Sequence, residues 1–379
     1  MPRCFSFTEV KNWCLQSCTF TKSGLRSTVT DLKDGTVMHC WVPKTRTDSK
    51  PDLLLIHGLG ANALWQWANI IPNIIHYFNV YVPDLIFFGD SYSTSPERSE
   101  SFQAQCLMKL MEANSVKKMS IVGLSYGGFV AYSMAAQFKE NVERVVICSS
   151  GVCMEEKDLR DGMFRVSDLE EASSILVPQS PEKLRELISY SFFKPPPLGL
   201  LPSCLLADFI HVMCTEYVEE KRDLIRAIPR DRNMSKISRI CQPTMILWGE
   251  YDQIFPLELG HRLKRHLGDN AELVIIKNAG HAFNVEKPKS AHVECCTPAN
   301  QVLTPHPTHP TQPFNSAIQL SWPSNLAAED DGDGGNGCAA TMTLHVRCRR
   351  RCHRFTLPPI LDLAFVFCCW VGWSAELDG

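Results

Sequence analysis

The feature that most constrains the fold is a serine between two glycines, where an apolar run gives way to a helical segment. Residues 119–122 read Met-Ser-Ile-Val, and residues 123–127 read Gly-Leu-Ser-Tyr-Gly with Ser125 at their centre. Residues 128–136 continue as an apolar, alanine-containing helical segment. This order predicts a buried strand, a tight turn and a helix, which together lift the Ser125 hydroxyl clear of the sheet at the positive end of the helix. Ser125 is therefore a candidate nucleophile.

An acid and a histidine follow this serine in the order expected after a serine in such a strand-to-helix turn. The strand-like run 244–248 leads into a loop with Asp252, and the run 273–276 leads into a loop with His281. Because the carboxyl ends of strands in an open parallel sheet are where a site forms, we expect the three side chains to meet there. His281 would take the proton of Ser125, and Asp252 would orient and stabilise the resulting imidazolium.

Two backbone amides complete the predicted site. Another apolar run leads into residues 57–60, His-Gly-Leu-Gly, where the glycines let the backbone approach a substrate. The amides of Leu59 and Tyr126 are predicted to form an oxyanion hole. His57 is interpreted as a support for its own loop rather than as a catalytic group. Glu250 is the rival acid to Asp252, and its loop position favours a solvated charge instead.

The distribution of strands predicts an α/β fold. Residues 28–41 read as a hairpin with Asp-Gly at its turn. Apolar strands then alternate with helical stretches, which indicates a mostly parallel sheet covered on both faces. Between residues 152 and 240 the strand signal disappears, and Ser180 before Pro181 predicts a helix start. Such an insertion would lie over the strand ends as a lid, with its apolar residues divided between its own core and an acyl or aryl pocket. The strands are expected near Leu53, Val80, Met119, Val145, Met245 and Val274.

Length and composition agree with one large α/β domain and an insertion. The chain of 379 residues has a net charge of −3 and a sequence pI near 6.5, which gives no electrostatic reason to bind nucleic acid. No apolar run of about 18 residues occurs, so no transmembrane segment is predicted, while peripheral membrane contact stays open. The 17 cysteines without a signal-peptide core indicate reduced thiols in a cytoplasmic protein. The cysteines and histidine at 348–353 have no matched second pair, so neither metal nor cofactor is predicted.

From about Gly24 to Pro288 the chain resembles the α/β-hydrolase family, closest to plant monoacylglycerol-lipase-like and C–C-hydrolase-like members. This resemblance implies the α/β-hydrolase fold with a helical lid, and supports the roles of Ser125, Asp252 and His281. One departure is local, since residues 86–87 are Ile-Phe where members often have Pro-Gly. The motifs that carry the resemblance are His57-Gly58-Leu59-Gly60, Pro83-Asp84-Leu85 with Gly89-Asp90-Ser91, the Ser125 turn, Trp248-Gly249-Glu250-Tyr251-Asp252, and Gly280-His281 with Glu286-Lys287-Pro288.

The composition changes from about residue 290 onward. In relatives, Lys287-Pro288 leads into a last helix that covers the sheet, but no apolar helical period follows here. An acidic glycine run at 329–335 fails the calcium-loop template, and the tail is expected to be disordered. The expected organisation is a docking segment 1–23, with an amphipathic surface helix as the alternative, a core in two parts 24–151 and 241–290 around a helical lid 152–240, and an atypical tail 291–379.

The predicted function is hydrolysis of a small to medium apolar carboxylic ester or lipid ester through an acyl-enzyme on Ser125. A C–C bond hydrolase of the meta-cleavage-product type would use the same three residues and is the first alternative. A non-catalytic ligand receptor or pseudoenzyme is the second, because fold alone does not determine activity. Epoxide hydrolysis and dehalogenation are disfavoured, since their nucleophile in this fold is a carboxylate.

Overall fold

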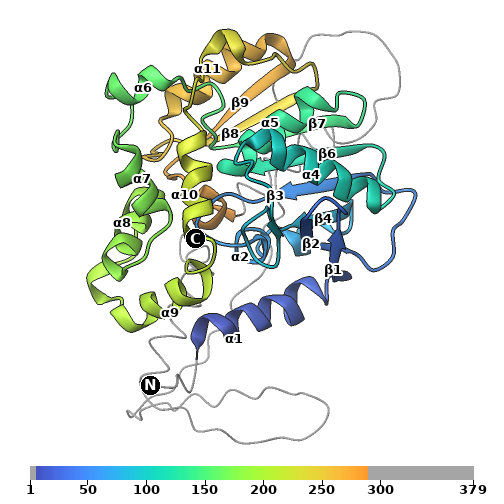
Figure 1. The fold of residues 1–379 in the computed structure, drawn as a ribbon, viewed down its shortest axis with the longest axis horizontal. Coiled ribbons are helices and arrows are strands. Elements are labelled where there is room, and N and C mark those ends of the chain that lie inside the picture. The colour runs from blue at the N-terminus through green and yellow to red at the C-terminus, as the bar shows by residue number, and fades with distance from the viewer. Residues whose placement is uncertain (1–5, 289–379) are drawn as a thin grey trace, which may run out of the picture. The chain divides into compact units, whose positions relative to one another are not determined.

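A mostly parallel sheet with helices on both faces forms the centre of the protein (Figure 1). The computed structural model describes residues 6–288. The sheet order is β1-β2-β4-β3-β6-β7-β8-β9, with β5 paired to β2, and β3, β4 and β6 to β9 run parallel. Every expected strand is present, as is the predicted antiparallel hairpin. The strands are β1 (Leu25–Asp31), β2 (Thr36–Pro43), β3 (Asp52–Ile56), β4 (Asn79–Pro83), β5 (Tyr92–Ser93), β6 (Met119–Leu124), β7 (Val142–Cys148), β8 (Thr244–Gly249) and β9 (Ala271–Ile276).

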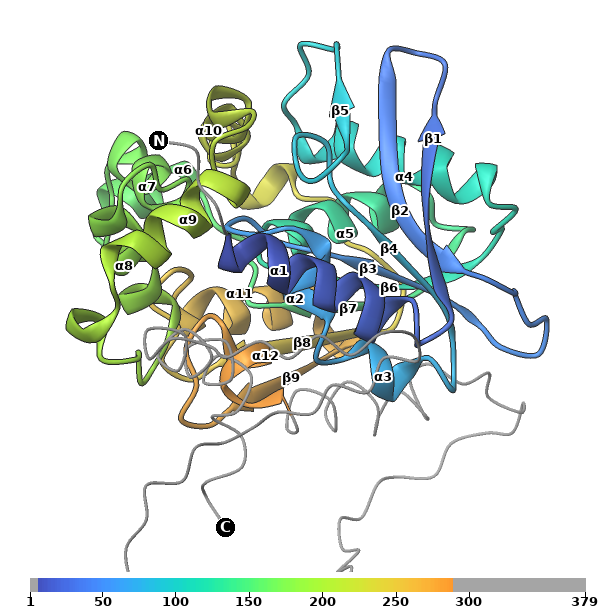
Figure 2. The same cartoon turned by 90° about the horizontal axis from the view of Figure 1, so that it is seen from below.

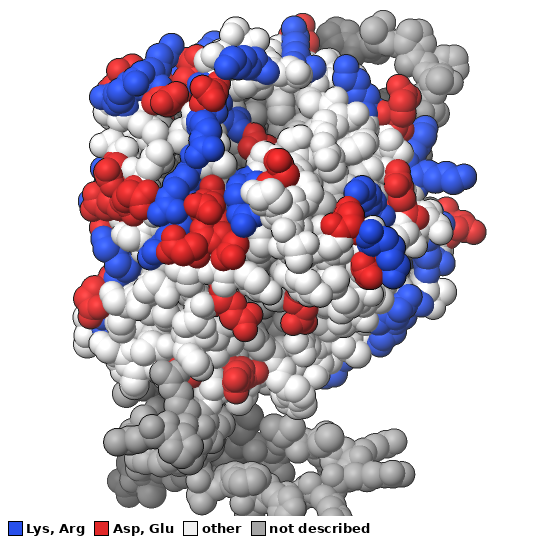
Figure 3. Space-filling model, viewed as in Figure 1, with Lys and Arg blue, Asp and Glu red and all other residues white. Residues whose placement is uncertain are grey.

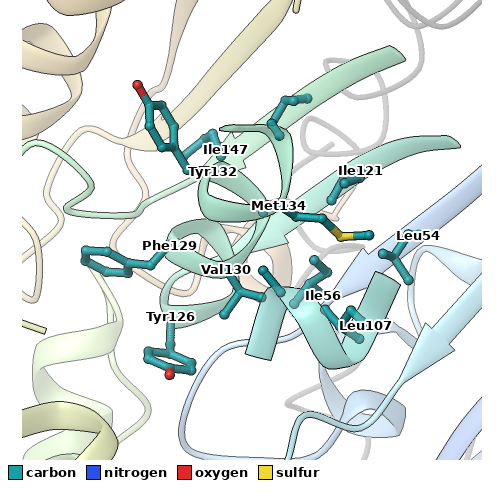
Figure 4. Close-up of a cluster of buried hydrophobic side chains, with 14 of the residues drawn as sticks. Leu54, Ile56, Leu107, Ile121, Tyr126, Phe129, Val130, Tyr132, Met134 and Ile147 are labelled. Carbon is teal, nitrogen blue, oxygen red and sulfur yellow. The ribbon is translucent and has the colours of Figure 1, made fainter. Parts of the chain in front are cut away.

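Helices cover the two faces because successive side chains of the buried strands point to opposite sides. On β6, Ile121 packs in one core with α4 and α5, whereas Val122 packs in the other with α2 and α3. Figure 4 shows the first core, where Val130 and Met134 of α5 lie among side chains of the strands and of α4. The helices of the core are α1 (Phe7–Cys14), α2 (Ala63–Trp67), α3 (Ile71–Ile74), α4 (Glu100–Ala113), α5 (Tyr126–Gln137), α11 (Leu257–Leu267) and α12 (Phe283–Glu286).

A helical insertion lies between β7 and β8, and it contains no strand, as predicted. It starts α8 where expected, since Ser180 Oγ accepts the Lys183 N–H and Pro181 is the first helical residue. Figures 1 and 2 both show these helices at the end of the molecule opposite the β1–β2 hairpin. The insertion has a small core of its own around Leu206 and Ile210, so part of its apolar content serves its own folding. Its helices are α6 (Glu156–Arg160), α7 (Leu169–Leu176), α8 (Pro181–Ser191), α9 (Ser203–Met213) and α10 (Val218–Ala227).

The N-terminal segment docks onto the rest of the protein. The Thr8 N–H donates to Asp208 Oδ2 of α9 at 2.9 Å, and Trp65 Nε1 donates to Asn12 Oδ1. Phe20 is fully buried, with its ring centroid 5.2 Å from that of Trp41. These contacts join α1 to the insertion and to α2, and join Phe20, which follows α1, to β2.

Several predictions concern residues that lie outside the described range. These are the predictions for the tail 291–379, including the acidic run at 329–335 and the cysteines at 348–353, and for residues 1–5 of the N-terminal segment. Within residues 6–288, no helix is both long enough and apolar enough to cross a membrane.

Candidate active site

Ser125 occupies a strained turn between β6 and α5. Its backbone has φ 54° and ψ −118°, a region that costs a non-glycine residue about 1–3 kcal/mol. The turn can be tight because Gly123 and Gly127, two residues to either side of Ser125, have no side chains. A Cβ on Gly123 would lie 2.3 Å from the Gly127 carbonyl oxygen, and one on Gly127 would lie 2.4 Å from that of Ile56. The glycines of the motif therefore permit the strand, turn and helix that were predicted around this serine.

The structure brings the predicted serine, histidine and aspartate into one hydrogen-bonded chain. His281 Nε2 lies 3.0 Å from Ser125 Oγ, and His281 Nδ1 lies 2.9 Å from Asp252 Oδ2. The Asp252 side chain is fully buried, and its Oδ1 accepts the N–H groups of Ile254 and Phe255. Because a carboxylate only accepts hydrogen bonds, we assign the Nδ1 proton to the bond with Asp252, which leaves Nε2 free to accept the proton of Ser125.

Glu250, the rival acid, has a different place. Its carboxylate accepts the Asn278 N–H and pairs with Lys277, both on the loop after β9. The hydrogen bond from Asn278, followed by that from Lys277, lowers the pKa of Glu250. Glu250 therefore holds two loops together at the surface, whereas Asp252 contacts His281.

Two backbone N–H groups near Ser125 are free to bind a ligand. The loop 57–60 passes directly beside the serine, since a Cβ on Gly58 would lie 2.8 Å from Ser125 Cβ. Tyr126 is the first residue of α5, where an amide has no acceptor within its own helix. Within residues 6–288, neither the Leu59 nor the Tyr126 N–H has a hydrogen-bond acceptor. Both amides that were predicted as oxyanion donors are thus available.

His57 holds this loop in place. It is fully buried, its Nδ1 lies 2.8 Å from the Gly58 carbonyl oxygen, and its Nε2 accepts the Leu85 N–H at 2.9 Å. Since Nε2 accepts a bond, the ring is neutral with its proton on Nδ1. Burial lowers the pKa of His57 below its ordinary value. These contacts agree with its interpretation as a loop support.

The neutral state of His57 should make folding stability depend on pH. The unfolded chain takes up a proton on this residue below about pH 6.5, whereas the folded chain does not, so stability should fall by up to about 1.4 kcal/mol per pH unit below that value. Urea unfolding at pH 7.5 and 5.5 measures the loss. The His57→Gln variant should lose less stability over that interval, because the glutamine amide can form hydrogen bonds but does not take up a proton. Burial also lowers the pKa of His266, but His266 contributes equally to the loss of stability in both proteins. Equal losses of stability in the wild-type protein and in His57→Gln would therefore contradict the assignment of a neutral His57.

The structure also shows supporting acids whose roles the sequence reasoning missed. Asp84 is buried, accepts the Ala63 N–H at the start of α2 at 2.9 Å, and pairs with His39 Nδ1 at 2.8 Å. Asp84 belongs to the Pro83-Asp84-Leu85 motif noted in the sequence. Its role could not be predicted there, because its partners His39 and Ala63 are distant in the sequence. Asp84 fixes the end of β4 against the helix that follows the 57–60 loop.

Glu286 has a similar supporting role for the His281 loop. Its Oε2 accepts the Gly280 N–H at 2.6 Å, and its Oε1 accepts the N–H groups of Phe193 at 2.9 Å and Lys194 at 3.2 Å. One carboxylate therefore joins the residue before His281 to the end of α8. The position of the insertion and the position of the histidine loop are coupled through this side chain.

An apolar cavity of about 90 Å³ lies next to the hydrogen-bonded chain. It is enclosed by α7, α8, α10 and the loop after β8, with Ile175, Tyr190, Ile225 and Phe255 among its lining residues. The Phe255 ring centroid is 5.8 Å from that of His281. A larger, more polar hollow of about 850 Å³ lies elsewhere, between α4, α5 and residues 227–238, and Ser125 and His281 line neither of the two. The smaller cavity is the apolar one, and Phe255 in its wall also contacts His281.

The loop that departs from the family motif contacts the insertion. Phe87 is buried and has φ 77°, which favours glycine. Its ring centroid lies 5.7 Å from that of Tyr217, just before α10. Phenylalanine at this position therefore adds a contact between core and insertion.

The comparisons with known proteins agree with this architecture. Residues 51–186 match the model of the alpha/beta hydrolase fold family. The mouse protein named monoacylglycerol lipase ABHD6 is 27% identical over 268 residues, which are 66% of this chain and 76% of that protein. A putative lipase from Acinetobacter baumannii superposes with a TM-score of 0.66 at 24% identity, covering 80% of this chain and 98% of that chain. A meta-cleavage product hydrolase from Pseudomonas fluorescens superposes with a TM-score of 0.59 at 21% identity, covering 74% and 99%.

The chain has the α/β-hydrolase fold, as the sequence motifs predicted. Among proteins of this fold it is similar to those named monoacylglycerol lipase. Among residues 6–288, no group of three or more His, Cys, Asp or Glu side chains is arranged to hold a metal ion.

Proposed function

We propose that this chain is a serine hydrolase that cleaves carboxylic esters of the lipid type through Ser125, His281 and Asp252. The observation that carries the proposal is the hydrogen-bonded chain from Asp252 through His281 to a strained serine beside two free amides. The similarity to proteins named monoacylglycerol lipase supports an ester as the substrate.

The geometry supports acyl transfer in two halves. Ser125 Oγ attacks the ester carbonyl carbon as its proton passes to His281 Nε2, and the oxyanion accepts hydrogen bonds from Leu59 and Tyr126. His281 then gives that proton to the leaving alkoxide, which departs as an alcohol. Water attacks the acyl-enzyme while His281 takes its proton. As the second tetrahedral intermediate collapses and releases the acid, His281 returns that proton to Ser125 Oγ. Asp252 stays ionised throughout and stabilises the imidazolium.

The cavity beyond Phe255 supports a short acyl tail. At about 30 Å³ per water in the liquid, its 90 Å³ corresponds to about three water volumes, and a water displaces about as much space as a methylene group. Its lining is apolar, so a chain of similar carbon number would be transferred favourably from water. On the face seen in Figure 3, basic and acidic side chains are intermixed, which favours no polyanionic partner there.

This assignment predicts a chain-length optimum that one substitution shifts. Against p-nitrophenyl esters from acetate to palmitate, the wild-type protein should prefer short acyl chains, whose last carbons fill a cavity of about three methylene volumes. Ala172→Leu adds bulk to the cavity wall and should lower kcat/KM for the hexanoate ester about tenfold while leaving the acetate ester nearly unchanged. Ala207→Leu on α9, whose side chain does not line the cavity, is the matched control. Identical chain-length profiles for the two variants would place the acyl group elsewhere.

The same assay discriminates the alternatives. A C–C bond hydrolase would use these residues on a vinylogous diketone and turn it over faster than any p-nitrophenyl ester. A receptor or pseudoenzyme would turn over neither at a rate above that of Ser125→Ala.

A further inference from the structure

The side-chain amide of Gln66 holds the loop that carries the predicted oxyanion donor. Gln66 Oε1 accepts the Gly58 N–H at 2.8 Å. Gln66 Nε2 lies 3.0 Å from the Gly58 carbonyl oxygen, 3.3 Å from that of Leu59 and 3.1 Å from that of Ala61. One amide thus contacts three residues of a loop that has neither strand nor helix hydrogen bonds of its own.

The helix that carries Gln66 is itself fixed from several sides. Asn62 caps α2 by accepting the Trp65 N–H, and the Ala63 N–H donates to the buried Asp84. Trp67 is almost completely buried beneath the helix. The Gln66 carbonyl oxygen also accepts Asn284 Nδ2 of α12, the helix that follows the His281 loop, at 3.2 Å. Gln66 therefore connects the 57–61 loop, through a rigid helix, to the segment that carries the predicted general base.

Peptide geometry explains what these bonds do for Leu59. The Gly58 carbonyl and the Leu59 N–H belong to one planar trans peptide unit, so they point in opposite directions. Gln66 Nε2 and His57 Nδ1 both lie at hydrogen-bond distance from that carbonyl oxygen and fix its direction. The Leu59 N–H is consequently directed away from Gln66, on the loop that passes beside Ser125.

We propose that Gln66 is a positioning residue that sets the direction of the Leu59 N–H for the transition state. The inference rests on the proposed hydrolase function. Gln66 is not aimed at a substrate, since its amide is occupied by the loop. Its loss should therefore affect stabilisation of the transition state more than substrate binding.

The test compares Gln66 with Asn79, the first residue of β4. The side-chain amide of Asn79 makes similar bonds to a loop, at the opposite edge of the sheet from the 57–61 loop. Asn79 Oδ1 accepts the Thr47 N–H at 2.9 Å, and its Nδ2 donates to the carbonyl oxygens of Thr47 and Lys50. Gln66→Leu should lower kcat for a p-nitrophenyl ester by about 100-fold, with KM changed less than about threefold. Asn79→Leu should lower the melting temperature without lowering kcat of the folded protein. Equal kcat values for Gln66→Leu and Asn79→Leu would show that Gln66 has only a structural role and would contradict the proposal.

A second variant keeps the test valid if Gln66→Leu does not fold. In Gln66→Glu, a carboxylate can accept from the Gly58 N–H but would repel the three carbonyl oxygens, whereas its protonated form can donate to one of them. The ratio of its kcat to that of the wild-type protein should therefore rise as the pH falls through the pKa of the new carboxyl group. A flat ratio would overturn the inference. If the hydrolase proposal itself is wrong, the result is different: the wild-type protein and Ser125→Ala would then show equal turnover.

Discussion

Replacing Ser125 or His281 with alanine should lower turnover of a p-nitrophenyl ester by a factor on the order of 10⁴ to 10⁶. Ser125→Ala removes the proposed nucleophile, and His281→Ala removes the proposed base, whose Nε2 lies 3.0 Å from Ser125 Oγ. The two losses should not add in the double variant, because the residues act as one unit. Measured kcat values for both single variants and the double variant test this, and a His281→Ala protein with near wild-type kcat would assign the base elsewhere.

A second serine in this protein offers an internal control for the nucleophile. Ser27 Oγ lies 2.9 Å from His39 Nε2, and His39 Nδ1 lies 2.8 Å from Asp84 Oδ2, so this chain of atoms resembles the one at Ser125. Ser27, however, lies within β1 in a regular antiparallel register, without a strained turn or a helix N-terminus behind it. A serine with a histidine and an acid but no such setting lacks the donors that stabilise an oxyanion.

A fluorophosphonate probe should therefore label Ser125 and leave Ser27 unmodified. Mass spectrometry of labelled peptides identifies the site, and Ser27→Ala should label like the wild-type protein. Labelling that persists in Ser125→Ala would refute the assignment of the nucleophile.

The parts of the site that the sequence predicted are those set by local rules. Around Ser125, glycines at both flanks and a change from strand to helix pattern are enough to predict the turn, because the steric demand is met within a few residues. Asp252 and His281 could be placed because each follows a buried strand, and parallel strands bring their carboxyl ends to one edge. The fold followed from the same apolar runs.

The supporting residues could not be predicted, because their roles depend on contacts between distant segments. Gln66 is an ordinary polar residue of a short helix until the 57–61 loop folds over it. Glu286 bonds to Phe193, which lies in the insertion, 93 residues earlier in the chain. Neither bond leaves a local pattern. The bounds of a strand follow from composition, whereas the identity of a loop support requires the tertiary structure.

Leu59→Pro should cost about 3 kcal/mol or more in transition-state stabilisation, because proline removes the N–H that is predicted to bind the oxyanion. Leu59→Ala keeps that N–H and should change kcat/KM only slightly, so it controls for loss of the side chain. The comparison requires that the proline variant be folded. Its neighbour Gly58 is conformationally permissive, which limits the backbone cost of the substitution. Circular dichroism and the melting temperature establish folding, and kcat/KM for one ester then gives the free-energy loss. A folded proline variant with wild-type turnover would mean that the oxyanion donor is not Leu59. In that case the free N–H beside Ser125 would have no catalytic role, and Gln66 would hold a loop that serves only the fold.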